Sequence, residues 1–254
     1  MRGDGGRCGG RECKVSYLAP IPEGATRILD NGFVRLVESW GGGDAGIPEA
    51  GIVEAARQST QGAFRGWDRD AKLHRYLYEH QHNTPFEFAG MVIEVRAPIF
   101  VFREWMRHRT QSYNEMSSRY APLPDLYYLP TVERLMADGG KQGGAVRGAL
   151  TLTRSEAVAF RADLARDYRA FSRRYKRALD SGVPKELARL GMPVGHYSQM
   201  RASANLRNWL AFLTLRMDPA AQWETQQFAR AVYAIVQREF PRTAALFGEG
   251  VEVT

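Results

Sequence analysis

Cysteine is almost absent from this sequence, and long apolar runs are absent altogether. The only two cysteines, Cys8 and Cys13, lie in a Gly/Arg-rich N-terminal stretch, so the body of the chain offers no thiolate nucleophile. A structural zinc site needs about four ligands, and no second cysteine pair is present to complete one. No uninterrupted apolar segment reaches the roughly 20 residues of a membrane-spanning helix. We therefore expect neither a cysteine nucleophile nor a membrane protein.

Length and charge narrow the class of protein further. The 254 residues, 44% of them hydrophobic, are typical of one globular domain. We expect residues 1–26 to form a flexible tail and residues 27–254 to form the domain. The tail lacks the apolar segment of a signal peptide, which predicts a cytoplasmic protein. A net charge of +7 permits nucleic-acid binding and equally an enzyme for phosphorylated ligands.

Hydrophobic periodicity predicts both strands and helices. The expected elements are strands at 33–40, 88–96 and 126–129, helices at 48–58, 70–81 and 155–181, and helices beginning at Pro98, Pro184 and Asp218-Pro219. The 155–181 helix carries an apolar stripe formed by Phe160, Leu164, Tyr168, Phe171, Tyr175 and Leu179. This stripe is expected to face the core or a subunit interface. Residues 137–148 are glycine-rich and are expected to form a mobile loop.

The most informative stretch begins in the helix that follows Pro98. Phe102, Trp105 and Met106 share one face of that helix. The helix is therefore expected to pack on the core and to present Arg107 at its C-terminal end. A polar loop is expected to follow.

Arg107, His108 and Arg109 place three potential cations side by side. Like charges held together repel, and each disfavours protonation of its neighbour. A fold tolerates such a cluster most easily where an anion or an electron-rich ring neutralises it. The alternative is an exposed basic turn, since runs of charge are usually solvated.

Two weaker motifs point elsewhere and are given little weight. Gly41–Gly46 formally contains G-x-G-x-x-G, but the acidic residue required about twenty positions later falls where a helix begins, not at the end of a second strand. We interpret it as a turn. His74, His80 and His82 suggest a metal site, although they lack the i, i+4 pairing of a zinc-binding helix. We expect no metal.

Polar residues in the C-terminal third have ordinary interpretations when taken singly. Ser203 is expected to cap a helix, with Asn205 and Arg207 in its first turn, where free backbone N–H groups favour anions. Arg216 falls at the far end of that helix. Alone, Arg189, Asn205 and Arg216 are typical of surface or capping residues.

The spacing of the central stretch changes this interpretation. Arg107-His108-Arg109, seven residues and then Ser117 resemble the Arg-His-Arg-x7-Ser signature of the flavin-dependent thymidylate synthases. Residues 82–87 and 186–200 resemble two further segments of that family, and the resemblance covers about residues 28 to 247. It implies an α+β fold, a single mixed domain with an antiparallel sheet flanked by helices and a long amphipathic helix. It also implies a homotetramer with active sites between subunits.

The resemblance also implies a reaction. In this family dUMP is methylated reductively to dTMP, methylenetetrahydrofolate supplies the carbon, and FAD carries hydride from NADPH or NADH. No nucleic acid is implied as a partner. Because the body of the chain lacks cysteine, Ser117 is the remaining protein nucleophile near dUMP. A serine hydroxyl is weak without a base, so we expect no covalent serine–uracil adduct.

The matched positions imply roles for individual residues. Those implied to bind FAD are Ser59, His82, Thr84, Glu87, Arg107, His108, Arg109, Glu115, Asn205 and Arg207. Those implied to bind dUMP are Glu104, Arg107, Glu115, Ser117, Ser118, Arg119, Arg189 and Arg216. Arg216 is implied to be catalytic, because a guanidinium at the N3–C4=O edge of uracil would stabilise the charge that develops there.

Three positions depart from the family pattern. Glu104 stands where many relatives carry glutamine, and a carboxylate beside phosphate is unfavourable unless it is paired. Ser118 replaces a frequent glycine. Ala211 stands where some relatives carry an asparagine that contacts FAD.

Two other classes of protein are alternatives. An arginine-rich RNA-binding module would expose aromatic residues along a basic stripe, whereas Trp105, Trp209 and Trp223 fall in expected core positions. A metal-dependent hydrolase would use the three histidines named above.

Overall fold

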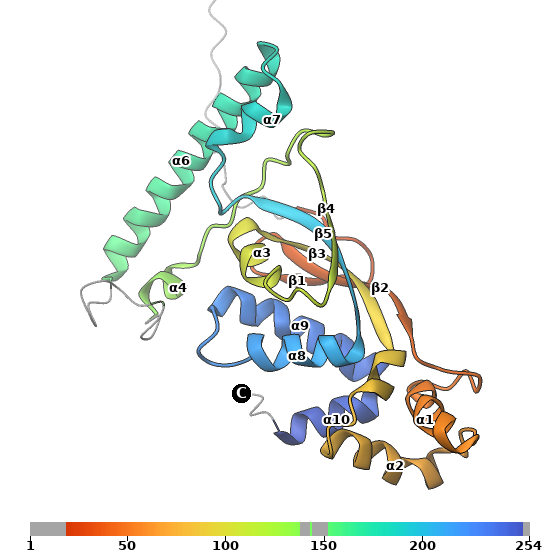
Figure 1. Cartoon of the computed structure of the whole chain (residues 1–254). Coiled ribbons are helices and arrows are strands. Elements are labelled where there is room, and N and C mark those ends of the chain that lie inside the picture. The colour runs from red at the N-terminus through yellow and green to blue at the C-terminus, as the bar shows by residue number, and fades with distance from the viewer. Residues whose placement is uncertain (1–18, 138–142, 144–151, 251–254) are drawn as a thin grey trace, which may run out of the picture.

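A computed structural model describes residues 19–137, 143 and 152–250. At its centre lies a five-stranded sheet in which every pair of neighbours is antiparallel, with the order β1-β2-β3-β5-β4 (Figure 1). The strands are β1 (Thr26–Ile28), β2 (Gly32–Trp40), β3 (Gly90–Pro98), β4 (Ser112–Glu115) and β5 (Tyr197–Asn205). The described helices are α1 (Ala50–Arg57), α2 (Trp67–Glu79), α3 (Ile99–Trp105), α4 (Val132–Met136), α6 (Arg154–Asp180), α7 (Lys185–Ala188), α8 (Leu206–Arg216), α9 (Trp223–Glu239) and α10 (Pro241–Gly250), with short 3-10 helices η1 (Gln58–Thr60), η2 (Thr84–Phe88) and η3 (Arg189–Gly191). The predicted α+β class is confirmed.

The centre of the sheet follows from simple alternation. Met91, Ile93 and Val95 on β3 are fully buried, because every second side chain of a strand points to the same face. The helices α3, α8 and α9 cover that face (Figure 1). The strands expected at 33–40 and 88–96 are therefore confirmed.

The segment after Arg109 is not the expected polar loop. Ser112–Glu115 forms β4, an edge strand that pairs with β5. The β5 strand was itself missed, because its inward positions include Ala202 and Ala204, small residues that weaken the alternating signal. The prediction that Ser203 caps a helix is wrong, since Ser203 lies within β5. Asn205 performs that role, its Oδ1 accepting from the backbone N of Asn208 at 3.0 Å.

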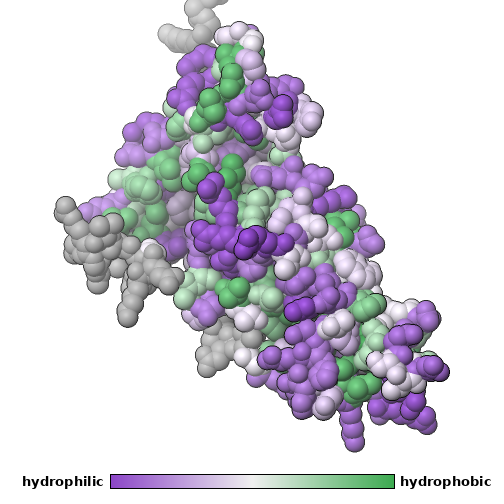
Figure 2. Space-filling view, viewed as in Figure 1, coloured by the Kyte–Doolittle hydropathy of each residue, from purple (hydrophilic) through white to green (hydrophobic). Residues whose placement is uncertain are grey.

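The long helix α6 lies at one end of the molecule, away from α10 (Figure 1). Thr153 and Glu156 form a capping box at its start. Tyr168 and Tyr175 of the predicted stripe are buried, whereas Phe160 is 51% exposed, so the stripe faces the protein except at its N-terminal end. Figure 2 shows apolar residues gathered on the surface near α6 and α7. Exposed apolar side chains there include Val158, Phe160, Leu187 and Val194.

The C-terminal helices differ in their boundaries from the prediction. Asp218-Pro219 begins a turn, and the helix α9 starts only at Trp223, whose side chain is 41% exposed and so is not a core residue. No described helix is both long enough and apolar enough to cross a bilayer. Apart from Ala137 and Gly143, the loop expected at residues 137–148 lies outside the described residues.

Two predictions concern the N-terminal third of the chain, the glycine-rich turn and the end of the tail. Gly41–Gly46 forms a turn between β2 and α1, as predicted. The described strands are all paired antiparallel and form no βαβ unit. Ala19 is buried, and its N–H donates to Asn31 Oδ1 at 2.8 Å. Residues from Ala19 onward are therefore attached to the body of the domain, and residues 1–18 of the expected tail lie outside the described part.

Candidate active site

The turn that follows α3 rests on two buried aromatic side chains. Trp105 and Phe212 are fully buried, and their ring centroids lie 4.5 Å apart. The imidazole of His108 packs edge-on against Phe212 at 5.0 Å. Trp105 Nε1 donates to Gln111 Oε1 at 3.1 Å. The core thus fixes where His108 lies, as expected for a helix that presents the Arg107-His108-Arg109 cluster.

Tyr113 connects this turn to the sheet. Its hydroxyl lies 2.8 Å from the carbonyl oxygen of His108 and 3.2 Å from that of Trp105. Burial raises the pKa of Tyr113 to about 12, so the phenol stays protonated and donates to these carbonyls. The sequence reasoning assigned Tyr113 no role. The only signal was one aromatic residue in an otherwise polar stretch.

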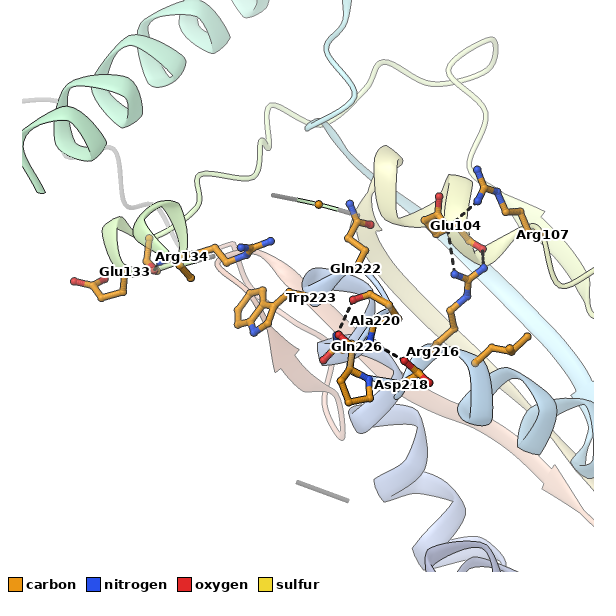
Figure 3. Close-up of a pocket in the computed structure, with 16 residues that line it drawn as sticks. Glu104, Arg107, Glu133, Arg134, Arg216, Asp218, Ala220, Gln222, Trp223 and Gln226 are labelled. Atoms are coloured by element: carbon orange, nitrogen blue, oxygen red, sulfur yellow. Dashed lines mark hydrogen bonds and ion pairs between the residues drawn. The ribbon is translucent and has the colours of Figure 1, made fainter. Parts of the chain in front are cut away.

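Arg216 is held by three partners at the end of α8. Its Nε donates to His108 Nε2 at 2.9 Å. Its Nη1 donates to Glu104 Oε2 at 3.1 Å and its Nη2 to the carbonyl oxygen of Glu104 at 2.7 Å (Figure 3). Arg107 Nη1 donates to the same Glu104 oxygen at 3.1 Å. One carboxylate therefore lies between two guanidinium groups, a pairing that the sequence had suggested for Glu104.

The hydrogen bond from Arg216 requires a neutral His108. An N–H of Arg216 can only donate, so the facing Nε2 must accept, and the ring proton resides on Nδ1. Burial, together with the nearby charge of Arg216, lowers the pKa of His108 to about 4. At neutral pH the cluster therefore carries its positive charge on arginines alone.

A cavity of about 1270 Å³ opens beside this cluster. Glu104, Arg107 and Arg216 line one end, and Arg134 and Trp223 line the other (Figure 3). The cavity is large enough for a ligand of nucleotide size. Its guanidinium groups suit an anionic or electron-rich ligand.

A second group of implied ligands lies around the loop after β4 and the η3 turn. Ser118 is 1% exposed, and its Oγ accepts from Arg189 Nη1 at 2.5 Å, so the extra hydroxyl at this position is accommodated. Arg119 pairs with Glu186 at 2.9 Å. The Oγ of Ser117 accepts from the backbone N of Arg119 at 3.3 Å.

Glu115 lies at the end of β4 and faces β5. Its Oε1 accepts from Ser198 Oγ at 2.5 Å. The backbone N of Met116 donates to the carbonyl of Gln199 at 2.8 Å. The sheet edge therefore determines where the loop of the second group begins.

A third group lies at the N-terminal end of α8. Glu87 and Arg207 form an ion pair, and η2 packs against α8. Thr84 and His82 are exposed near the start of η2, and Ser59 is exposed within η1. Arg207 occupies the first turn of α8, as predicted, whereas Asn205 is the cap and not part of that turn.

Side-chain contacts join Glu104, Arg107, His108 and Arg216 in one group, Ser118 and Arg189 in a second, and Glu87 and Arg207 in a third, and these groups remain separate. Within residues 19–137, 143 and 152–250, no hydrogen bond or ion pair joins the Ser117–Arg119 segment or Arg189 to the Arg216 cluster. The cavity beside Arg216 is likewise lined by none of these loop residues. Within one chain, the residues predicted to bind dUMP therefore lie in two separate groups.

The three histidines considered for a metal site do not form one group, because His80 and His82 both pack on the exposed Tyr76 whereas His74 lies in the core. His74 is buried and its Nε2 lies 3.1 Å from Thr243 Oγ1, whereas His80 stacks on Tyr76 at 4.0 Å. No cluster of three metal-ligating side chains occurs in the described part of the chain. The structure thus gives the hydrolase alternative no support. Trp105 and Trp209 are fully buried, as expected against the RNA-binding alternative, whereas Trp223 is exposed.

Comparison with known proteins agrees with this geometry. A family model described as "Thymidylate synthase complementing protein" matches residues 36–242. A flavin-dependent thymidylate synthase of Thermus thermophilus is 40% identical over 223 residues, covering 87% of this chain and 77% of that protein. The enzyme of the same description from Thermosipho africanus is 37% identical, covering 87% of this chain and 92% of that protein.

A solved structure shares the fold. The UMP/dUMP methylase PolB from Streptomyces cacaoi, bound with 5-Br dUMP, is 32% identical with a TM-score of 0.76, covering 88% of this chain and 97% of that one. The fold and the relatives together define a methyltransferase of nucleotide biosynthesis that uses a flavin. The chain belongs to the flavin-dependent thymidylate synthase family.

Proposed function

We propose that this protein converts dUMP to dTMP by reductive methylation, with methylenetetrahydrofolate as carbon donor and NADPH as the source of hydride for FAD. The observation that carries the proposal is the Arg216–His108–Glu104 cluster beside the large cavity. It presents a guanidinium, held from three sides, to a space that can admit a pyrimidine ring. Bound FAD would supply the hydride.

The residues present suit a flavin and a nucleotide. Arg107, Arg109 and Arg207 are exposed, and a cation near the N1–C2=O edge of a flavin favours its anionic reduced form. Ser59, His82, Thr84, Glu87, Asn205 and Arg207 would line the same cofactor with the Arg-His-Arg cluster. Arginine forks match phosphate oxygens in pairs.

The substrate would be held by Glu115, Ser117, Ser118, Arg119 and Arg189. Arg216 would polarise the N3–C4=O edge of uracil and stabilise negative charge there as the ring is attacked. Ser117 would donate a hydrogen bond to dUMP and not act as a nucleophile. His108, the nearest candidate base, already accepts from Arg216 and is not available to deprotonate a serine.

We further propose a homotetramer in which neighbouring subunits complete each site. The separation of the loop residues from the Arg216 cluster supports this, because each group needs a complementary group from elsewhere. The exposed apolar surface near α6 and α7 supports it as well, since such patches mark protein interfaces.

The experiment is an anaerobic absorbance titration of the purified protein. A yellow flavin spectrum that bleaches with NADPH, and that reoxidises on addition of dUMP and methylenetetrahydrofolate with formation of dTMP, is the expected result. The same titration with UMP in place of dUMP tests whether the protein distinguishes ribose from deoxyribose in its substrate. A colourless protein that binds no added FAD, or one that forms no dTMP, contradicts the proposal.

A further inference from the structure

Glu104 is the acidic member of the Arg216–His108–Glu104 cluster, and its carboxylate is occupied by two arginines of the same chain. Its Oε2 accepts from Arg107 and from Arg216 at 3.1 Å each. Its side chain is 26% exposed, compared with 14% for Arg216 and 70% for Arg107. The carboxylate is therefore partly shielded from water, and its exposed fraction is nearer to that of Arg216 than to that of Arg107.

The backbone at Glu104 adds a second contact. Its carbonyl belongs to the last turn of α3, where carbonyl groups lack helical partners, and it accepts from Arg216 Nη2 at 2.7 Å. A guanidinium at a helix C-terminus is also stabilised by the helix dipole. Arg216 ends α8, so the ends of α3 and α8 are joined through this one side chain.

These contacts leave Arg216 little freedom. Its Nε and one N–H on each Nη are engaged by His108 and Glu104, so only the remaining N–H on each Nη is available to a ligand. A guanidinium has five N–H donors in a rigid plane. Fixing three of them fixes the direction of the other two.

We propose that Glu104 is a positioning residue that orients Arg216 toward the substrate ring and does not itself bind the substrate. This inference rests on the proposed function. Loss of the carboxylate leaves the site with one more net positive charge, so binding of an anionic nucleotide should hold or improve. Turnover should fall, because Arg216 is no longer held in its productive direction.

The test compares Glu104→Ala and Glu104→Gln with Glu133→Gln. Glu133 lies on the same cavity but pairs with exposed Arg154 at 3.3 Å, so its substitution makes a similar charge change without touching Arg216. For Glu104→Ala we expect kcat to fall about tenfold or more, with KM for dUMP unchanged or lower. Glu104→Gln retains an acceptor oxygen and should recover part of the loss. Glu133→Gln should keep the kcat of the wild type, and any change in its KM for dUMP reports the effect of charge alone.

Crystal structures of the same variants give a readout that does not depend on activity. In Glu104→Ala, the guanidinium of Arg216 should leave His108 Nε2, whereas Glu133→Gln should keep that contact. A raised KM with unchanged kcat would make Glu104 a substrate ligand and overturn the inference, as would an Arg216 that stays in place in Glu104→Ala. If the wild type forms no dTMP, the proposed function fails, while the crystal structures still decide the role of Glu104. Flavin content and thermal unfolding show that each variant is folded.

Discussion

At the scale of single residues, Arg216 is the side chain to which we assign the central role in the proposed reaction. It is mostly buried, and three different atoms accept its protons. A buried guanidinium keeps its charge at every physiological pH. The site can therefore offer a constant positive charge to a pyrimidine whose own charge changes during reaction.

Arg216→Ala should reduce kcat by about a hundredfold or more, a loss typical of removing one group that stabilises developing charge. FAD binding should change far less. Steady-state kinetics and flavin titration measure the two effects. Ser117→Ala is the comparison, and it should weaken dUMP binding yet keep measurable turnover. Complete loss of chemistry in Ser117→Ala with normal dUMP and FAD occupancy, or a trapped serine–nucleotide adduct, would contradict the assignment.

His74 gives a residue-scale prediction about stability. It is 2% exposed, and burial lowers its pKa from 6.5 to about 4. The unfolded chain therefore binds more protons than the folded one between these two values, so stability is fully present above pH 6.5 and is lost as the pH falls toward 4. Between pH 7.5 and pH 5 this residue alone should cost on the order of 1–2 kcal/mol.

Glu49, which lies near His74, titrates in the opposite sense because burial raises its pKa. The measurement is therefore a comparison of wild type and His74→Gln by urea unfolding at the two pH values. The variant should lose less stability on acidification than the wild type. Equal losses in both proteins would show that His74 is not the acid-sensitive group.

At the scale of elements, the edge strand β4 and the helix α3 form one unit. Tyr113 donates to the carbonyls of Trp105 and His108, and β5 holds β4 along its length. The Arg-His-Arg turn thus lies between a packed helix and a paired strand, which limits its motion.

Tyr113→Phe should weaken FAD binding about three- to tenfold, because one net hydrogen bond contributes about 0.5–1.5 kcal/mol. The ring itself remains to fill its place. Tyr127→Phe is the matched control, since its hydroxyl accepts from Ser172 at 2.9 Å, outside the site. Flavin titration followed by fluorescence measures both. Equal FAD affinity in wild type and Tyr113→Phe would show that the turn does not need this connection.

The helices and strands also show which parts of the fold could be predicted from the sequence. The helix from Ile99 and the strand β3 were predictable, because bulky apolar residues mark their periods clearly. The strand β5 was not, since alanine and serine at alternating positions carry little hydrophobic contrast. Asn205 was placed in a helix turn and proved to be the cap, because boundaries depend on local hydrogen bonds that periodicity does not record.

At the scale of the whole molecule, the residues proposed to form one site lie in separate groups of a single chain. Several residues predicted to act together contact one another, as Arg107, His108 and Arg216 do through Glu104 and each other, but the sequence could not tell that the predicted groups would lie apart within one chain. The separation between these groups depends on the order of the strands in the sheet and on where α6 and α7 pack. Both are tertiary properties that no short motif encodes.

Division of the site predicts complementation between subunits. Arg109→Ala and Arg189→Ala should each be inactive alone, and mixing them under conditions that exchange subunits should restore part of the activity. The reason is that some mixed sites would contain both intact arginines. Activity assays before and after exchange measure the gain. A fully active monomer by light scattering would contradict the shared site.

The carbonyl contact between Glu104 and Arg216 has a consequence for how this sequence can drift over generations. Every amino acid carries a backbone carbonyl, so that half of the attachment survives any codon change at position 104 that leaves α3 intact. The carboxylate half can then be lost and regained without detaching Arg216 completely. Substitution at this position therefore weakens the attachment of Arg216 without abolishing it, so a lineage can pass through such a variant and still recover the carboxylate later.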